Sequence, residues 1–179
     1  FMVDTTPPPI PEIVTYIPDP TNDNTPTLRW NNVSGAVSYR VQLSNNSSFT
    51  KITADSIKTT TFVTINTPVS DGMKYWRVAS RDNLTNQSTF SISDSFMVDT
   101  VPVNIVVVSP YGGEIWETGS EYKIIWEAID NIGIKAIAIY YQIDAGTIWT
   151  KIDSLESGFT SPDTLLWIVP NTPTSMARV

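Results

Sequence analysis

The sequence predicts an all-β chain that folds as two β-sandwich domains in tandem. Short segments of alternating polar and apolar residues, separated by clusters of turn-forming residues, indicate half-buried strands. Only 16% of the 179 residues are charged, and a chain rich in Asn, Ser, Thr and Pro suits strands joined by turns. The third observation is a repeat, because the residues at 1–5, Phe-Met-Val-Asp-Thr, occur again at 96–100.

The repeat sets the expected domain boundaries. Its interval matches one β-sandwich of about 100 residues. The sequence therefore predicts three parts: the end of a preceding repeat or linker at residues 1–5, a first sandwich at 6–100, and a second at 101–179. The prolines at 7–9 and Pro11 predict a short, stiff linker, because proline favours an extended chain.

Six strands are expected in the first domain. The clearest alternation places four apolar side chains on one face, Val37, Tyr39, Val41 and Leu43, and side chains two apart share a face of a strand. Asp71 and Gly72 predict a turn. The expected strands are residues 12–17, 26–30, 37–44, 59–65, 73–81 and 90–99.

The second domain repeats this pattern, with Asp144–Ala145–Gly146 as a tight turn. One expected inward set is Tyr122, Ile124 and Trp126; another is Ile137, Ile139, Tyr141 and Ile143; a third is Leu165, Trp167 and Val169. Residues 104–109 and 148–152 add strands, and residues 177–179 begin another. We expect this domain to lack its last strand and the natural chain to continue, because a sandwich without its closing strand exposes ladder groups.

Composition excludes several classes of function. The 11 basic residues are scattered among 18 acidic ones, which disfavours nucleic acid and anionic lipid as partners. The chain has no cysteine and no histidine, so disulfides, zinc–thiolate sites and Ser-His-Asp triads are excluded. No apolar run approaches the ~20 residues of a membrane span.

Four motifs of the first domain form a familiar set: Trp30, residues 38–41, residues 71–78 and residues 96–100. With them the domain resembles the fibronectin type III-like modules of bacterial extracellular proteins. The usual motif near the sixth strand is Asp-Gly, two tyrosines and Trp-Arg-Val, and Lys74 stands in place of the first tyrosine. Alternation points Trp76 and Val78 inward and Tyr75 outward.

The second domain resembles an Ig-like module of bacterial surface proteins, through residues 109–116, 122–126, 141–149 and 167–171. The two resemblances imply a non-catalytic spacer in a larger, repetitive, secreted or cell-surface protein, with neighbouring domains of the same chain as partners. One alternative is adhesion to a surface protein or carbohydrate binding. Another is a filament subunit joined by strand or edge contacts.

Aromatic residues are the candidate carbohydrate-binding groups. Trp116, Trp149, Tyr140 and Tyr111 could stack on sugar rings if they line one exposed surface. The ordinary interpretation is that most aromatic residues belong to the core. Four tryptophans on apolar positions are expected there: Trp30, Trp76, Trp126 and Trp167.

Carboxylates are expected mostly in turns, where aspartate bonds to nearby backbone. They are Asp19, Asp23, Asp71, Asp82, Asp94, Asp130, Asp144 and Asp163. No spacing pairs two of them as glycoside hydrolysis requires, so no catalytic, cofactor-binding or metal-binding residue is assigned and the chain is not expected to be an enzyme. Calcium at the domain junction, held by Asp99 with Asp130 and Asn131, stays an alternative.

Two further motifs carry no expected function. Glycosylation sequons begin at Asn32, Asn46, Asn83 and Asn86, but a chain this rich in Asn, Ser and Thr produces the pattern by chance. An intramolecular isopeptide bond needs a buried lysine beside an asparagine or aspartate. Lys123 falls on an outward position and Lys135 at a strand end, so neither is a candidate.

Overall fold

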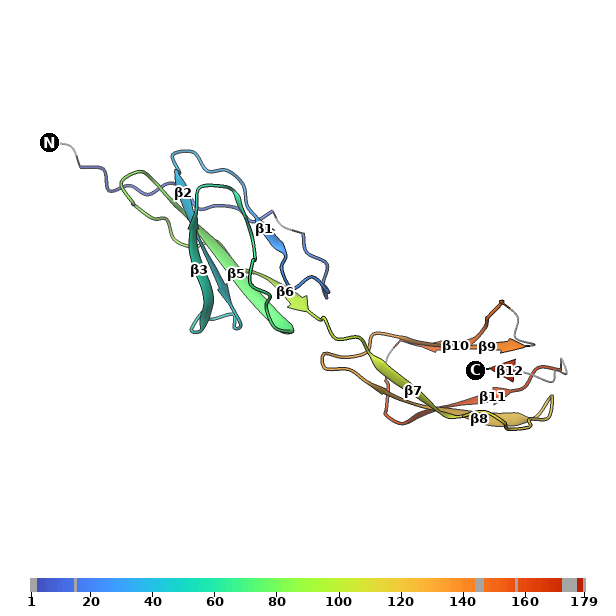
Figure 1. Cartoon of the computed structure of the whole chain (residues 1–179). Helices are drawn as coiled ribbons and strands as arrows, with labels where there is room; N and C mark the ends of the chain where they lie inside the picture. Colours follow the sequence, from blue (N-terminus) through green and yellow to red (C-terminus); the bar gives the residue numbers. More distant parts are fainter. Residues whose placement is uncertain (1–2, 15, 144–146, 157, 172–176, 179) are drawn as a thin grey trace. The chain divides into compact units, whose positions relative to one another are not determined.

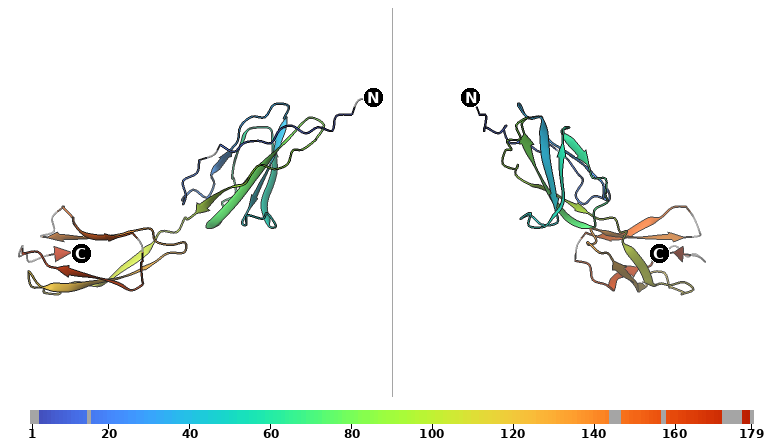
Figure 2. Two further views of the ribbon diagram at one scale, coloured as in Figure 1. Left: turned by 180° about the vertical axis from the view of Figure 1, so that it is seen from behind. Right: turned by 60° about the vertical axis from the view of Figure 1, so that its left-hand side comes forward.

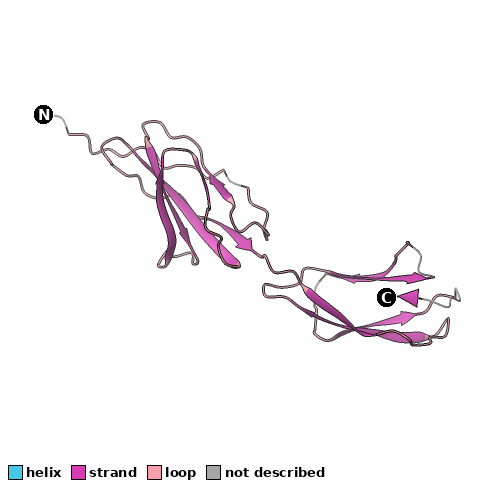
Figure 3. Ribbon diagram, in the orientation of Figure 1, coloured by secondary structure: helices cyan, strands magenta, loops and turns pink. Residues whose placement is uncertain are grey.

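The predicted all-β fold class is confirmed. The computed structural model describes residues 3–14, 16–143, 147–156, 158–171 and, as backbone, 177–178. Within these residues it contains twelve strands and no helix (Figure 3), and no helix there could span a membrane. The chain divides into two compact units, Phe1–Thr100 and Val101–Val179, called unit 1 and unit 2 below.

Unit 1 consists of two antiparallel sheets (Figure 1). The smaller pairs β1 (Thr27–Arg29) with β4 (Phe62–Thr64), and Ile13 adds a bridge to Trp30 beside β1. The larger sheet has the order β3-β2-β5-β6. Its strands are β2 (Ser38–Ser44), β3 (Ile52–Lys58), β5 (Gly72–Arg81) and β6 (Asp94–Val98).

The two sheets enclose one core, and separate views show them as two layers (Figure 2). Alternation along β2 and β5 buries every second side chain, because neighbours two apart share a face of a strand. The buried apolar residues are Leu28, Trp30, Val33, Tyr39, Val41, Leu43, Trp76, Val78, Phe96 and Val98. As predicted, Trp76 and Val78 are fully buried and Tyr75 is only partly buried.

Three expectations for unit 1 are wrong. β3 was not expected, because its polar side chains give a weak alternation at the edge of the sheet. β2 begins at Ser38, so Val37 lies outside the ladder and is 52% exposed. The proline segment, expected as a short, stiff linker, is instead packed into unit 1, because Pro8 and Pro11 are buried and the Ser80 hydroxyl donates a 2.6 Å hydrogen bond to the Pro9 carbonyl oxygen.

Unit 2 also has two sheets, with the strand orders β11-β8-β7 and β10-β9-β12. β12 (Ala177–Arg178) pairs with β9 where a strand was expected to begin, and Val179 lies outside the described residues. The turn at 144–146 also lies outside them. The strands are β7 (Asn104–Ser109), β8 (Glu121–Ile129), β9 (Ile137–Ile143), β10 (Thr150–Leu155), β11 (Asp163–Ile168) and β12.

The core of unit 2 lies between β8 and β9. Its buried residues are Ile124, Trp126, Ala128, Ile137 and Ile139. Trp167 packs against this cluster and also contacts the ring of Tyr141, with 5.1 Å between centroids. Two of the expected inward sets are only partly buried: Ile143, at the end of β9, is 37% exposed, and Leu165, Trp167 and Val169 are half-buried.

Candidate functional site

The predicted aromatic residues have different environments. Trp116 is partly buried and packs against the core of unit 2. Its ring stacks on Tyr122, with 4.7 Å between centroids and 1° between planes. Tyr111 lies in the turn after β7 and is 86% exposed. Trp116 is therefore a packing residue, and Tyr111 stands apart from the sheet faces.

Tyr140 lies on β9 and Trp149 immediately precedes β10, and the two side chains are exposed by 41% and 49%. Tyr140 pairs with Lys151 in the β9–β10 ladder, and Trp149 precedes Lys151 by two residues. These three residues, Tyr140, Trp149 and Lys151, are called the β9–β10 surface below.

The candidate carboxylates accept hydrogen bonds from backbone N–H groups, either of neighbouring residues or of another segment of the same unit. Asp82 accepts hydrogen bonds from the backbone N–H groups of Leu84 and Asn86 at 2.9 and 2.8 Å. Asp19, Asp23, Asp71, Asp94, Asp130 and Asp163 make similar bonds, whereas Asp144 lies outside the described residues. No group of three or more acidic residues within the described part of the chain could hold a metal ion.

The residues considered for calcium have local roles as well. The Asp130 carboxylate accepts bonds from the backbone N–H groups of Ile132 and Gly133, both at 2.8 Å. Asp99 belongs to unit 1, where its N–H donates to the Thr21 carbonyl oxygen at 2.9 Å. Asp99 lies in unit 1 and Asp130 and Asn131 in unit 2, so a junction site with calcium stays a prediction.

Among the lysines, the structure singles out one that the sequence did not. Lys123 and Lys135 are exposed. Lys74 is only 2% exposed, and its ammonium donates to the Asp71 carbonyl oxygen at 3.2 Å and to the Ser70 hydroxyl at 3.5 Å. Burial lowers the pKa of Lys74, because desolvation outweighs the attraction of Asp71.

Three of the four sequon asparagines use their side chains in local contacts. Asn32 accepts a hydrogen bond from the Tyr39 hydroxyl at 3.0 Å. Asn46 accepts one from the Thr50 backbone N–H at 3.2 Å, and Asn86 donates one to Asp82 at 2.8 Å. Asn83 is exposed. These contacts explain the asparagines as turn residues.

The first and last segments of unit 1 lie side by side and run parallel. Thr21 and Val98 form a parallel bridge. The Thr21 N–H donates to the Met97 carbonyl oxygen at 2.8 Å, and the Asp99 N–H donates to the Thr21 carbonyl oxygen at 2.9 Å. The Met97 N–H donates to Asp19 Oδ1 at 2.9 Å. We call this set of bonds, from Asp19 and Thr21 to residues 97–99, the terminal clamp.

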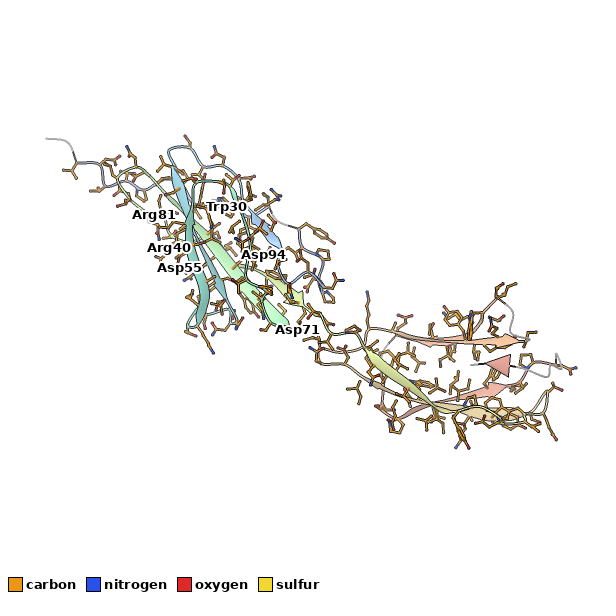
Figure 4. All side chains as sticks on the ribbon, viewed as in Figure 1. Trp30, Arg40, Asp55, Asp71, Arg81 and Asp94 are labelled. Atoms are coloured by element: carbon orange, nitrogen blue, oxygen red, sulfur yellow. The ribbon has the colours of Figure 1, made fainter. Side chains whose placement is uncertain are left out.

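The two ends of unit 1 are fixed at opposite ends of β5. Near the C-terminal end of that strand, Ser80 bonds to the Pro9 carbonyl oxygen. Before its N-terminal end, Asp71 accepts bonds from the Thr100 backbone N–H at 3.1 Å and hydroxyl at 2.8 Å. Figure 4 labels Asp71 where the chain leaves unit 1. Tension on the chain therefore acts along the length of β5.

The outer face of the larger sheet carries a network of polar and aromatic side chains. Arg77 donates to Gln42 Oε1 at 3.0 and 2.8 Å, and Gln42 donates to Asp55 at 2.8 Å. The Arg77 guanidinium lies 4.1 Å from the centroid of Phe49 and 4.2 Å from that of Phe90. Cations are attracted to aromatic ring faces. This outer-face network therefore joins β2, β3 and β5 to the loop that contains Phe49 and the loop that contains Phe90.

Asp55 ends this network at the edge strand. Arg40 and Asp55 form an ion pair with 2.6 Å between nitrogen and oxygen, and Figure 4 shows their labels together on β2 and β3. The hydrogen bond from Arg40 lowers the pKa of Asp55 below its ordinary value. The side chains are 38% and 34% exposed, so solvent screens the pair and its contribution to stability is small.

A cleft of about 470 Å³ opens between the free edges of β3 and β4. The inward residues of β3, which face Leu43, Val41 and Tyr39 in the ladder, are Ala54, Ser56 and Lys58. Small side chains there leave Val41 and Leu43 at the floor of the cleft. Lys58 points a charge inward from an edge strand, a feature that opposes the addition of another strand.

Sequence reasoning missed the terminal clamp, the outer-face network and the burial of Lys74. Arg77 and Gln42 lie at outward positions of their strands, and such positions normally predict side chains exposed to solvent. Phe49 lies in a loop, where alternation makes no prediction. The motif Asp-Gly-Met-Lys at 71–74 gave one usable signal, because Lys74 shares the inward parity of Trp76.

Comparisons with known proteins give little further information. No family model matches the sequence, and no curated protein matches it. Among solved structures, chitinase ChiA74 from Bacillus thuringiensis matches with a TM-score of 0.44 and 16% identity, over 99% of this chain and 29% of the chitinase chain. This chain thus spans less than a third of that chain's length. The function has to be argued from the chain's own residues.

Proposed function

We propose that the chain is a non-catalytic structural module, a spacer that carries tension in a larger secreted or cell-surface protein. Unit 1 would be a fibronectin type III-like domain and unit 2 an Ig-like domain. Each unit supports its assignment because it consists of two antiparallel sheets, β1-β4 and β3-β2-β5-β6 in unit 1 and β11-β8-β7 and β10-β9-β12 in unit 2, as in β-sandwiches. Neighbouring domains of the same chain are the proposed partners.

The terminal clamp is the observation that supports a mechanical role. Thr21 and Val98 are parallel partners, and the chain runs from Thr21 back toward one end of unit 1 and from Val98 on toward the other. Tension then pulls the two segments past each other along their length. Hydrogen bonds between parallel strands are evenly spaced, so they resist such sliding together rather than opening one after another.

A second contact upstream reinforces this path. Before the force reaches Thr21, it must detach the segment beside β1, where the Val14 N–H donates to Arg29 at 3.1 Å and the Asn31 N–H donates to Glu12 at 2.8 Å. The hydrogen bond from Ser80 to Pro9 adds to this attachment. These bonds support the proposal because they lie on the route that tension takes through unit 1.

The carboxylates support a non-catalytic role. A glycosidase needs two carboxyl groups that face each other across the substrate. In the described residues the candidates Asp19, Asp82 and Asp130 hold backbone N–H groups of their own unit. Their lone pairs stabilise turns and the terminal clamp, which is a structural use of the side chain.

Single-molecule stretching of the chain tests the mechanical proposal. Thr21→Pro removes the N–H that donates to Met97, one bond of about 1 kcal/mol, and Asp19→Ala removes the acceptor for the Met97 N–H. We expect both variants to lower the unfolding force of unit 1. Asp23→Ala, which removes a local turn bond to Thr25, is the matched control. Equal unfolding forces for all four proteins would refute the proposal.

Carbohydrate binding is the second candidate, and the β9–β10 surface favours it. Two exposed aromatics, Tyr140 on β9 and Trp149 just before β10, supply flat apolar area of the kind that marks binding surfaces. Binding to a glycan array that Trp149→Ala abolishes and Tyr111→Ala leaves unchanged would support this function. No binding by the unaltered chain would remove it.

A further inference from the structure

The inner side of β3 is left uncovered in unit 1. The larger sheet has four strands, whereas the sheet that faces it consists, within the described residues, of β1, β4 and the segment at Ile13. Ala54 of β3 lies opposite the buried Leu43 and thus on the inner side of the sheet, yet Ala54 is exposed. The cleft between β3 and β4 therefore has room for one more strand, beside β4 and over β3.

The edge of β4 presents backbone groups to this position. The Ile65 N–H donates to the Pro26 carbonyl oxygen at 3.1 Å, so the backbone of Ile65 faces β1. Backbone groups alternate in direction along an antiparallel strand, so those of Thr64 and Asn66 point away from β1. Both residues line the cleft. An extended peptide in the cleft can therefore pair with this edge, a mode of recognition in which the peptide adds a strand to a sheet.

Charge selects the kind of peptide that fits. Among the described residues that line the cleft, Lys58 alone is charged, and no carboxylate in the described part of the chain pairs with it. An inward charge on an edge strand opposes the addition of an apolar strand. A carboxylate at the matching position of the incoming strand neutralises that charge. Lys58 thus rejects apolar strands and accepts acidic ones, which is how a repulsive group gives specificity.

The inward residues of β3 set the spacing that the peptide needs. Lys58, Ser56 and Ala54 follow one another at intervals of two, and the last two lie opposite Val41 and Leu43 on the floor of the cleft. Side chains of the incoming strand also share a face at intervals of two. An acidic residue beside Lys58 therefore places the next two inward side chains over the apolar floor, where burial favours apolar groups.

We propose that the cleft binds an extended peptide that pairs with β4 and carries one acidic residue and two apolar residues at intervals of two. The carboxylate of the peptide pairs with the Lys58 ammonium, and its apolar side chains cover Val41 and Leu43. The inference goes beyond the mechanical role of unit 1 and does not depend on it, because none of these residues belongs to the terminal clamp.

Fluorescence anisotropy of the whole chain with two labelled peptides tests the proposal. The peptides Thr-Glu-Thr-Val-Thr-Val-Thr and Thr-Val-Thr-Val-Thr-Glu-Thr carry the pattern in the two chain directions. We expect at least one to bind. Glutamine in place of its glutamate, or Lys58→Gln in the protein, should weaken binding by about fivefold, the upper range for a partly exposed ion pair. Lys51→Gln, at an exposed position outside the cleft, is the matched control and should bind as the parent chain does.

Charge reversal and hydrogen exchange locate the bound peptide. Lys58→Glu should reverse the preference, so that a peptide with lysine in place of glutamate binds more tightly than the acidic peptide. Exchange of the Thr64 and Asn66 amide hydrogens should slow when the peptide is bound. The proposal is overturned by no binding of either peptide, by equal binding of the glutamate and glutamine peptides, or by binding that Lys58→Gln leaves unchanged. Slower exchange only at other strands, or hexanoate binding as tightly as the peptide, would also overturn it.

Discussion

Arg77 shows how a single outward side chain becomes structural. Its guanidinium lies between the rings of Phe49 and Phe90 and donates two bonds to Gln42, which is only 6% exposed. Phe49 adopts a φ of 53°, a left-handed conformation that bulky residues rarely take. The aromatic contacts with Arg77 help to hold that loop residue in place.

We expect Arg77→Ala to lower the free energy of unfolding of unit 1 by about 1–3 kcal/mol, since it removes two cation–π contacts and leaves a buried Gln42 oxygen without its donor. Urea denaturation measures the loss. Arg29→Ala is the control, because Arg29 is exposed and has one ring contact, with Phe62 at 5.3 Å. Equal losses for the two variants would contradict the role given to Arg77.

Lys74 makes the free energy of unfolding of unit 1 depend on pH in the alkaline range. Its folded-state pKa lies below the ordinary lysine value of about 10.4, so between the two values the unfolded chain binds more protons and stability rises with pH. At pH values below the folded-state pKa, Lys74 is charged in both states, and the folded state bears the full free-energy cost of burying that charge. We expect Lys74→Met to raise the melting midpoint near pH 7 and to remove this rise.

Melting curves from pH 7 to the alkaline range, compared between the two proteins, check this prediction. Lys58→Met serves as the control, because Lys58 is only partly buried. A parent chain and a Lys74→Met variant with the same dependence on pH would contradict it.

At the scale of the strand, alternation predicted where the large apolar side chains go. Tyr39, Val41 and Leu43 are buried, and so are Trp76 and Val78. Alternation failed where tertiary contacts cover an outer face. Gln42 is buried on the outward side of β2 because Arg77 and Asp55 bond to it and Phe49 lies nearby.

The candidate sites were less predictable than the strands. The aspartates were expected in turns, and Asp82 and Asp130 confirm this by bonding to nearby N–H groups. The terminal clamp joins Thr21 to residues 97–99, and nothing in the local sequence encodes a parallel pairing over that separation. Such a pairing depends on how the whole domain folds, and the pattern of residues along one segment carries no information about it.

The turn into β5 gives a prediction at this scale. Gly72 has a φ of 101°, which side chains rarely adopt. We expect Gly72→Ala to destabilise unit 1 by about 1–2 kcal/mol through backbone strain, although no neighbouring atom lies closer than 4.0 Å to the added carbon. Urea denaturation checks the value. Gly112→Ala, with a φ of 112° in unit 2, should spare unit 1; an unchanged stability of Gly72→Ala would contradict the account.

At the scale of the molecule, each unit has a core of its own. We expect unit 1, produced alone as residues 1–100, to unfold at the same urea midpoint as it does in the whole chain. The fluorescence of Trp30 and Trp76, both buried in unit 1, reports the transition of the isolated unit. A midpoint clearly below that of the whole chain would show that unit 1 depends on unit 2.

The direction in which unit 1 resists force tests its mechanical role most directly. The chain lacks cysteine, so pairs of cysteines can attach handles at chosen residues. One pair, at Thr6 and Thr100, pulls the terminal clamp along its length. The other, at Ser47 and Thr100, pulls across the sheet, because the turn after β2 lies at the same end of β5 as Thr100. We predict a higher unfolding force for the first pair; an equal or lower force would contradict the account.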